Sequence, residues 1–271
     1  MRTWLLSLGL AAMVQSALCA ERPFVWPHGA RAAVSLAYDD AIDSQLDHAV
    51  PALDKYGLKA SFYLTLGSPS LARRMPEWRA LAARGFELGN HTLFHQCLRS
   101  PPGREWVTPE RDLEHTTAAQ MIEQVRVGNA MLQAIDGNTE RTFTVPCGDR
   151  LAAGTDYVQG LRDDFVAIKS GEGGVVADMQ GLDVHAVGVT APSDVTGAQL
   201  IALVEQARAR GTMINFTFHG IGGDYLTVAS PAHEQLLAWL AAHRDEVWTD
   251  TFINLMRYVK AQQAAAGTGK K

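Results

Sequence analysis

Residues 89–95 of the chain are Gly-Asn-His-Thr-Leu-Phe-His, and residues 38–40, which follow an apolar run upstream, are Tyr-Asp-Asp. Histidines four positions apart lie on one face of a helical turn, a spacing that suits a transition metal. A carboxylate from the end of a neighbouring strand would complete the ligand set and leave positions for water and substrate. The spacing alone is weak, because nine histidines occur in 271 residues. Together with the paired aspartates it predicts a metal-dependent hydrolase.

The first 20 residues are predicted to be a secretory signal peptide. Arg2 supplies a positive charge, residues 4–14 are apolar, and small residues surround position 20. The apolar stretch is too short to span a bilayer, so no membrane span is expected. We therefore expect an exported protein, periplasmic or secreted, in which residues 21–271 form a single catalytic domain.

The charge and the cysteine content narrow the function further. Arg2 is one of 24 basic residues, so its removal leaves 23 against 29 acidic residues, a net charge of −6 with neutral histidines. This balance disfavours nucleic acid or an anionic membrane as the main partner, and no protein partner is implied. Cys97 and Cys147 remain in the exported part. A disulfide between them and two partly buried thiols are both open interpretations.

Apolar strands and amphipathic helices alternate along the chain. The run Ala32–Ala37 has the pattern of a strand buried on both faces, which is typical of a parallel sheet. Further strands are expected at residues 60–66, 86–89, 141–145, 165–169, 184–187, 213–218 and 247–248, and helices at 51–56, 76–83, 117–135, 157–161, 199–210, 230–243 and from 253. Right-handed crossovers close such a chain into a distorted or incomplete (β/α) barrel with seven to eight parallel strands. An open doubly wound sheet is the competing architecture.

Two details of the helices are also predicted. Met121 and Met131 are expected to belong to the buried stripe of the helix at 117–135, with no cofactor implied. Ser230 is expected to be an N-cap, with Pro231 at the first helical position.

The expected strand ends carry unusual polar residues. In parallel barrels, function gathers at the carboxyl ends of the strands. Four ends here carry Asp39-Asp40, His91 with His95, Pro146-Cys147-Gly148, and His219. Packing could explain the polar residues at any single strand end, but it explains less well why four strand ends carry them.

These residues permit a specific chemistry. Asp40, His91 and His95 can hold Zn²⁺ or a similar divalent ion. Neighbouring residues within a strand point to opposite sides, but at a strand end Asp39 can turn toward the site and act as general base.

The other two strand ends supply an acid and a hydrogen-bond donor. His219 is expected to protonate the leaving group. Backbone N–H groups at Cys147 and Gly148 are expected to stabilise an oxyanion, and one such donor contributes about 3 kcal/mol in other enzymes.

In their order and separation these motifs resemble the polysaccharide deacetylase family, also called the NodB-homology domain or carbohydrate esterase family four. The resemblance covers residues 31–258 and rests on Tyr38-Asp39-Asp40, His91-Thr-Leu-Phe-His95, Pro146-Cys147-Gly148 and Phe218-His219. It implies a distorted (β/α) barrel and an enzyme that removes N- or O-acetyl groups from carbohydrates. It also implies zinc as the cofactor, with Co²⁺ or Ni²⁺ as alternatives.

The resemblance assigns roles by matching position. Asp39 is then the base, His219 the acid, and Asp40, His91 and His95 the metal ligands.

The sequence departs from the family pattern in two places. Thr144 occupies the place of an arginine that usually orients the base, and Arg141 and Arg150 are candidate substitutes. The aspartate and tryptophan of the fourth motif are not recognisable, and the weak candidates for that aspartate are Asp163, Asp164 and Glu172.

The expected substrate is an acetylated polysaccharide or oligosaccharide, and two other functions remain open. One is a C–N hydrolase of a small amide. The other is a zinc-holding carbohydrate-binding protein without turnover, which the presence of both Asp39 and His219 disfavours, since binding needs neither a base nor an acid. Trp26, Trp106 and Trp248 are open to either sugar stacking or packing.

Overall fold

The computed structural model describes residues 24–267. Its centre is an eight-stranded sheet in the order β10-β1-β2-β3-β4-β7-β8, with β9 on the other side of β1. The strands of this sheet pair in parallel and have the following bounds: β1 Ala32–Asp39, β2 Ser61–Leu64, β3 Glu87–Asn90, β4 Thr142–Thr144, β7 Ala167–Glu172, β8 Val187–Val189, β9 Met213–Phe218 and β10 Val247–Asp250. A separate antiparallel hairpin contains β5 Leu151–Ala152 and β6 Thr155–Asp156.

The sheet curls into a nearly closed barrel. Beyond β8, Thr190 joins β9, because its N–H donates to the Asn215 carbonyl at 2.8 Å and its carbonyl accepts from the Thr217 N–H at 2.9 Å. On the other side of β1, β10 pairs with the first half of that strand and β2 with the second half. The expected distorted (β/α) barrel with seven to eight parallel strands is therefore confirmed.

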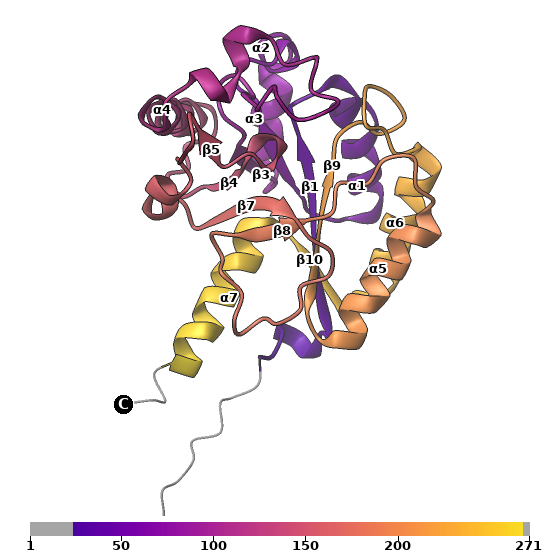
Figure 1. The fold of residues 1–271 in the computed structure, drawn as a ribbon. Helices are drawn as coiled ribbons and strands as arrows, with labels where there is room; N and C mark the ends of the chain where they lie inside the picture. The colour runs from indigo at the N-terminus through magenta and orange to yellow at the C-terminus, as the bar shows by residue number, and fades with distance from the viewer. Residues whose placement is uncertain (1–23, 268–271) are drawn as a thin grey trace, which may run out of the picture.

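Helices cover the barrel from outside (Figure 1). Helix α6 contacts both α1 and α5 on one side, whereas α3 contacts both α2 and α4 on the other side. The bounds are α1 Val50–Tyr56, α2 Pro69–Arg73, α3 Met75–Ala83, α4 Ala118–Asp136, α5 Gly197–Arg210, α6 Ser230–Ala242 and α7 Phe252–Gly267. A π-helical segment precedes α1, and the short 3₁₀ helices are η1 Pro27–Gly29, η3 Pro109–Arg111, η4 Leu113–His115, η5 Pro146–Gly148 and η6 Gln159–Asp164.

The helix ends follow from local sequence. Thr117 and Thr196 begin α4 and α5 with capping boxes, in which the side chain and the backbone satisfy each other's open hydrogen bonds. Gly137 and Gly211 end these helices at φ values of 78° and 73°, a left-handed conformation that glycine adopts without strain. Helix α6 differs from the prediction, because Ser230 is its first residue and makes no side-chain cap hydrogen bond.

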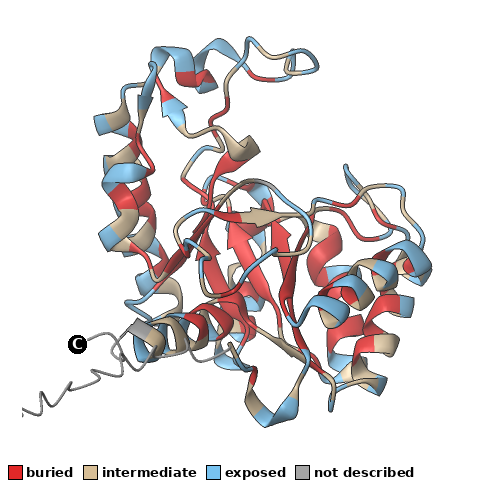
Figure 2. Ribbon diagram, turned by 60° about the horizontal axis from the view of Figure 1, so that its bottom comes forward, coloured by how far each residue is buried: buried red, intermediate tan, exposed pale blue. Residues whose placement is uncertain are grey.

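The burial pattern of β1 separates two environments. Its residues alternate between the two faces of the sheet. Val34, Leu36 and Tyr38 belong to the apolar layer under α5 and α6. Ser35 and Asp39 face the barrel interior, and they are also buried. Figure 2 shows buried strands at the centre of the molecule and buried helix faces turned toward them.

Two predicted details are corrected. Met131 is 41% exposed, because it precedes buried Leu132 and lies about 100° around α4 from it, outside the stripe. The strand expected at 184–187 begins only at Val187, because Asp183 forms a turn. Its carboxylate accepts from the His185 N–H at 2.9 Å and its carbonyl from the Ala186 N–H at 3.0 Å.

The predicted signal peptide, residues 1–20, lies outside the described residues. Within residues 24–267, no helix combines the length and the apolar character that crossing a bilayer requires.

Candidate active site

The four strand ends singled out by the sequence meet at one edge of the barrel. Asp39 is the last residue of β1, His91 follows β3, Cys147 lies just beyond β4, and His219 follows β9. Because these strands run in parallel, their carboxyl ends lie at the same edge.

Asp40, His91 and His95 form a compact cluster. Asp40 Oδ1 lies 3.2 Å from His91 Nε2 and 3.2 Å from His95 Nε2. This oxygen is buried and has no hydrogen-bond partner. One carboxylate and two imidazoles thus direct their ligand atoms at a common point, as a divalent metal site requires.

Backbone strain turns Asp40 toward this point. Asp40 has a φ of 82° and Ala41 a φ of 56°, values that residues other than glycine rarely adopt. The strand geometry therefore ends at Asp39, and the two neighbouring carboxylates both face the site. Strain of this kind costs about 1–3 kcal/mol per residue and is concentrated at functional sites.

The two histidines do not lie on a helical turn, contrary to the prediction. Thr92 has a φ of 66° and His95 a φ of 50°, so the segment is an irregular turn. Side chains build it: Asn90 Oδ1 accepts from the Thr92 N–H at 2.8 Å, and Thr92 Oγ1 accepts from the His95 N–H at 2.9 Å. The local polar residues replace helical hydrogen bonds and still bring both imidazoles to Asp40.

A hydrogen bond on the side away from Asp40 orients the ring of His91. Its Nδ1 lies 2.7 Å from the Thr144 carbonyl, so this nitrogen carries the proton and Nε2 is left to face Asp40. Burial lowers the pKa of His91, but the nearby carboxylates of Asp39 and Asp40 outweigh it and raise the pKa. Burial, with the charge of His91, lowers the pKa of His95 to about 4.

The two aspartates differ in their electrostatics. Burial raises the pKa of Asp40, but the contact with His91 and the charges of the surrounding imidazoles hold this pKa well below its usual range. Burial also raises the pKa of Asp39, and here the positive charges of His91, His219 and Lys169 offset only part of the effect. Two adjacent carboxylates with opposite shifts are suited to different tasks.

Asp39 and His219 flank the cluster. Asp39 is 2% exposed, and its Oδ2 lies 3.9 Å from His91 Nε2. His219 Nε2 lies 3.9 Å from Asp40 Oδ2, and its side chain is 15% exposed. The Gln45 side-chain amide donates to the backbone carbonyls of both Asp39 and His219, so it ties the ends of β1 and β9 together.

Tyr225 belongs to the site and was missed by the sequence analysis. Its hydroxyl donates to Asp40 Oδ2 at 2.8 Å, so this oxygen of Asp40 is hydrogen-bonded whereas Oδ1 is not. Tyr225 comes from the glycine-rich loop between His219 and α6. Nothing in that loop distinguishes this tyrosine from a surface residue, and only the folded loop brings it to Asp40.

Cys147 is bonded to Cys97, which resolves the open alternative in favour of a disulfide. The bond joins the loop after His95 to the loop after β4, with a Cα–Cα distance of 6.0 Å. The Gly148 N–H already donates to the Val145 carbonyl at 3.1 Å. The Cys147 N–H is therefore the remaining candidate of this pair for an oxyanion donor.

The candidate substitutes for the missing arginine have other partners. Arg141 forms a buried ion pair with Asp136 at 2.5 Å and also donates to the Leu88 carbonyl. Arg150 pairs with Asp156 at 2.8 Å. Neither guanidinium forms an ion pair with Asp39 among the described residues.

The candidates for the fourth motif lie elsewhere. Asp163 and Asp164 lie on η6, which packs against α4, and Asp164 pairs with Arg126 at 2.9 Å. The side chain of Glu172 is outside the described part of the structure. Asp163 and Asp164 are therefore not part of the cluster.

A groove of about 420 Å³ leads from the cluster to the surface. Asp40 and His95 lie at its floor, and Phe94, Trp106 and Tyr225 are lining aromatic residues that are each about half exposed. The Trp106 ring lies 6.0 Å from the His95 ring.

The other two tryptophans have a packing role. Trp26 is 3% exposed, and its ring lies 6.1 Å from that of Trp248, within the apolar cluster that contains α7 residues. Of the three candidate sugar-stacking tryptophans, only Trp106 lines the groove.

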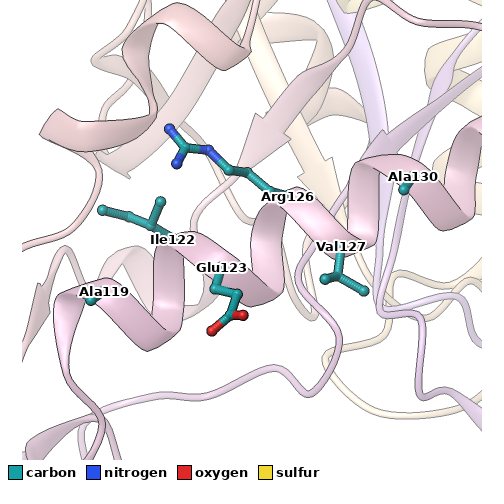
Figure 3. Close-up of a pocket in the computed structure, with 6 residues that line it drawn as sticks. All are labelled: Ala119, Ile122, Glu123, Arg126, Val127 and Ala130. Carbon is teal, nitrogen blue, oxygen red and sulfur yellow. The ribbon is translucent and has the colours of Figure 1, made fainter.

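A larger hollow of about 590 Å³ lies on the solvent side of α4 (Figure 3). All its lining residues come from this helix: Ala119, Ile122, Glu123, Arg126, Val127 and Ala130. It contains none of the clustered site residues. Size alone therefore does not identify the site of chemistry in this molecule.

Comparisons with known proteins confirm the expected resemblance. Residues 28–161 match the model of the family described as polysaccharide deacetylase. The matched range includes Asp39, Asp40, His91, His95 and Cys147, and it ends before His219. A gellan lyase from a Bacillus species is 27% identical over 124 residues, which are 46% of this chain and only 4% of that protein.

Solved structures share the fold. The peptidoglycan deacetylase PdaC from Bacillus subtilis is 14% identical, with 87% of this chain and 95% of PdaC covered at a TM-score of 0.53. A CE4 family pseudoenzyme from Bacillus anthracis is 16% identical, with 88% of this chain and 69% of that chain covered at a TM-score of 0.53. At these identities the likeness shows the fold alone.

Proposed function

We propose that this chain is a metal-dependent hydrolase that removes N- or O-acetyl groups from a carbohydrate, in keeping with the polysaccharide deacetylase family whose model residues 28–161 match. The observation that carries the proposal is the convergence of Asp40, His91 and His95 on one point, with Asp39 and His219 beside them. A structural neighbour is a pseudoenzyme, so the fold by itself does not support activity. The proposal rests on these side chains.

We propose that Asp40, His91 and His95 hold a divalent ion, Zn²⁺ or in its place Co²⁺ or Ni²⁺. The residues fit such an ion, because the buried Asp40 Oδ1 lacks a hydrogen-bond partner and faces two imidazole nitrogens at 3.2 Å. An ion in a site of this composition supplies Lewis-acid chemistry, which activates water and polarises a carbonyl oxygen.

The remaining residues handle protons and charge. Asp39 accepts the proton of the attacking water, and its burial gives the carboxyl a raised pKa that suits a base. His219, on the far side of Asp40, donates a proton to the leaving nitrogen or oxygen of the sugar. The Cys147 backbone N–H is the proposed donor to the developing oxyanion.

The groove supports a carbohydrate substrate. Phe94, Trp106 and Tyr225 offer half-exposed aromatic faces beside the cluster, and sugar rings pack their apolar C–H faces on such side chains. A C–N hydrolase of a small amide needs no aromatic faces outside its reaction centre. A binding protein without turnover needs neither Asp39 nor His219 in place.

We also propose that the protein is exported to the periplasm or secreted. The sequence of residues 1–20 supports this, and so does the Cys97–Cys147 disulfide, since disulfides persist in oxidising compartments. Mass spectrometry of the protein produced by its native secretion route should find a chain that begins near residue 21.

Acetate release tests the function directly. Residues 21–271 would be incubated with acetylated chitooligosaccharides, peptidoglycan, acetylated xylan and a small aryl acetate, each before and after chelation and after zinc is restored. We expect release from at least one glycan, loss with the chelator and recovery with zinc. His243→Ala provides a control, because His243 stacks on Trp239 away from the site and its loss should change nothing.

Two results would contradict the proposal. Release that survives complete metal removal would exclude the metal role. No release from any glycan, by protein that carries one metal ion per chain, would favour the small-amide or binding-only function.

A further inference from the structure

Lys169 has an unusual environment for a lysine. It lies on β7 and is 1% exposed. Its Nζ makes no hydrogen bond, and no carboxylate of the described residues forms an ion pair with it. Lys169 Nζ lies over two aromatic rings, 4.8 Å from the centroid of Tyr63 and 4.6 Å from that of Phe252. A buried ammonium without a polar partner is costly, so its presence needs an explanation.

The sheet places this ammonium close to the candidate base. Lys169 is the register partner of Thr144, whose carbonyl orients His91. The Tyr63 ring, over which Nζ lies, belongs to the register partner of Asp39 on β2. Lys169 therefore enters the barrel from β7 and approaches the same interior region into which Asp39 points from β1.

Two carboxylates act on Lys169, and they differ in how fully their oxygens are hydrogen-bonded. Burial lowers the pKa of Lys169 to about 8, while the charges of Asp39 and Glu87 raise it. Glu87 accepts hydrogen bonds from Ser61 Oγ at 2.6 Å, from the Ile253 N–H at 2.9 Å, and from Thr142. Asp39 Oδ1 is buried with no hydrogen-bond partner. Of the two carboxylates, only Asp39 therefore has a buried oxygen that is still open to a partner.

We propose that Lys169 is a positioning residue for Asp39, with an ammonium that provides the countercharge for this carboxylate from inside the barrel. The inference rests on the proposed function, in which Asp39 is the base. Arg141 and Arg150, the sequence candidates for this task, are engaged with Asp136 and Asp156. The alternative is that Lys169 serves only to balance Glu87.

A stability cycle on metal-free protein distinguishes these alternatives without any turnover. The variants are Asp39→Asn, Glu87→Gln and Lys169→Met, alone and in the two pairs that include Lys169→Met. We expect the Asp39→Asn/Lys169→Met protein to unfold at a higher denaturant midpoint than the sum of the two single shifts predicts, because neither charge is then left alone. Additive shifts for this pair would overturn the inference, whatever the pair with Glu87→Gln shows.

Kinetics of the metal-loaded protein give the second test. We expect Lys169→Met to lower kcat by about 10–100-fold, the cost of a misplaced catalytic group, with KM and metal content unchanged. Lys169→Arg should restore part of kcat. Lys55→Met is the matched control, because Lys55 pairs with Glu234 on the surface. An unchanged kcat in Lys169→Met would overturn the inference.

The two failures can be told apart. A wild-type protein without deacetylase activity would overturn the proposed function, and the stability cycle would still decide whether Lys169 and Asp39 act on each other. An active wild type with an equally active Lys169→Met protein would leave the function in place and remove Lys169 from it.

Discussion

Tyr38 and Asp39 are neighbours on β1, are almost completely buried, and belong to two different environments. Tyr38 points outward under α6, where its hydroxyl shares a hydrogen bond of 2.6 Å with His233 Nε2. Asp39 points into the barrel, where its Oδ1 has no hydrogen-bond partner. Two consecutive residues thus carry one buried polar group with a hydrogen-bond partner and one buried oxygen without a partner.

The difference shows that the two faces of β1 serve different purposes, stability on the outer face and chemistry on the inner face. The outer face of β1 buries apolar side chains against helices, and this burial supplies stability. The inner face carries polar groups whose burial costs stability, and such groups are kept where function requires them. Substitutions on the two faces should therefore separate folding from chemistry.

The largest loss of activity is expected for a substitution in the candidate metal site. Asp40→Ala should abolish metal binding and lower kcat/KM by at least about 10⁴-fold, because the chemistry of the ion is lost entirely. Metal content by atomic emission and acetate release would be measured on the same samples. A variant that keeps one metal ion per chain would show that Asp40 is not a ligand.

Asp39→Asn should have the next largest effect. We expect kcat to fall by about 10³-fold while metal content stays at the wild-type value, because a general base is lost and the ligands are kept. Single-turnover acetate release with a metal assay measures both quantities. Undiminished turnover would mean that another group accepts the proton.

Leu36→Ala tests the outer face. Leu36 is fully buried under the helices, so its truncation should lower the free energy of unfolding by about 4 kcal/mol. Urea unfolding measures this change, and kcat of the folded fraction should be unaffected. A change in kcat at full folding would show that the two faces are coupled.

The outer face should also respond to acid. Burial lowers the pKa of His233 to about 4. Between about pH 6.5 and 4 the unfolded chain therefore binds a proton at this histidine that the folded chain does not, and stability falls as the pH falls through this window. The loss amounts to up to about 3 kcal/mol. Urea unfolding of wild type and His233→Gln across this range should show a flatter profile for the variant.

Tyr225→Phe should have the smallest effect. It removes the hydrogen bond to Asp40 Oδ2 and leaves all three candidate ligands in place. Loss of such an outer partner typically weakens metal binding by about 10–100-fold. We expect the lower end of this range, measured by competition with a coloured chelator. Unchanged affinity would assign Tyr225 to the groove alone.

The fold and the main cluster could be predicted because strand periodicity and strand ends are local properties of the sequence. Apolar runs that end in Asp39 and His91 mark the edge of the barrel at which their side chains meet. The turn that carries His95 was predicted wrongly as helical, because the spacing of two histidines does not reveal the positive φ of Thr92 and His95.

Lys169 and Tyr225 could not be predicted from the sequence, because only the tertiary structure brings them close to the aspartates of the site. Lys169 is one polar residue within an otherwise ordinary strand, and only closure of the barrel brings it toward Asp39. Tyr225 reaches Asp40 across 185 residues of chain, through a loop whose path the sequence does not specify. Neither position carries a motif.

The Cys97–Cys147 disulfide has a practical consequence for handling the protein. It anchors the loop that follows His95, and the sulfur of Cys97 lies 3.7 Å from His95 Nδ1. A thiol reductant in a purification buffer would reduce this disulfide and would also compete for the proposed divalent ion, since thiolates are strong zinc ligands. A loss of activity in such a buffer could then come from reduction of the disulfide or from loss of the metal, and the two causes could not be separated. Phosphine reductants in one arm and metal chelators in another keep the redox state of the loop and the metal content as separate experimental variables.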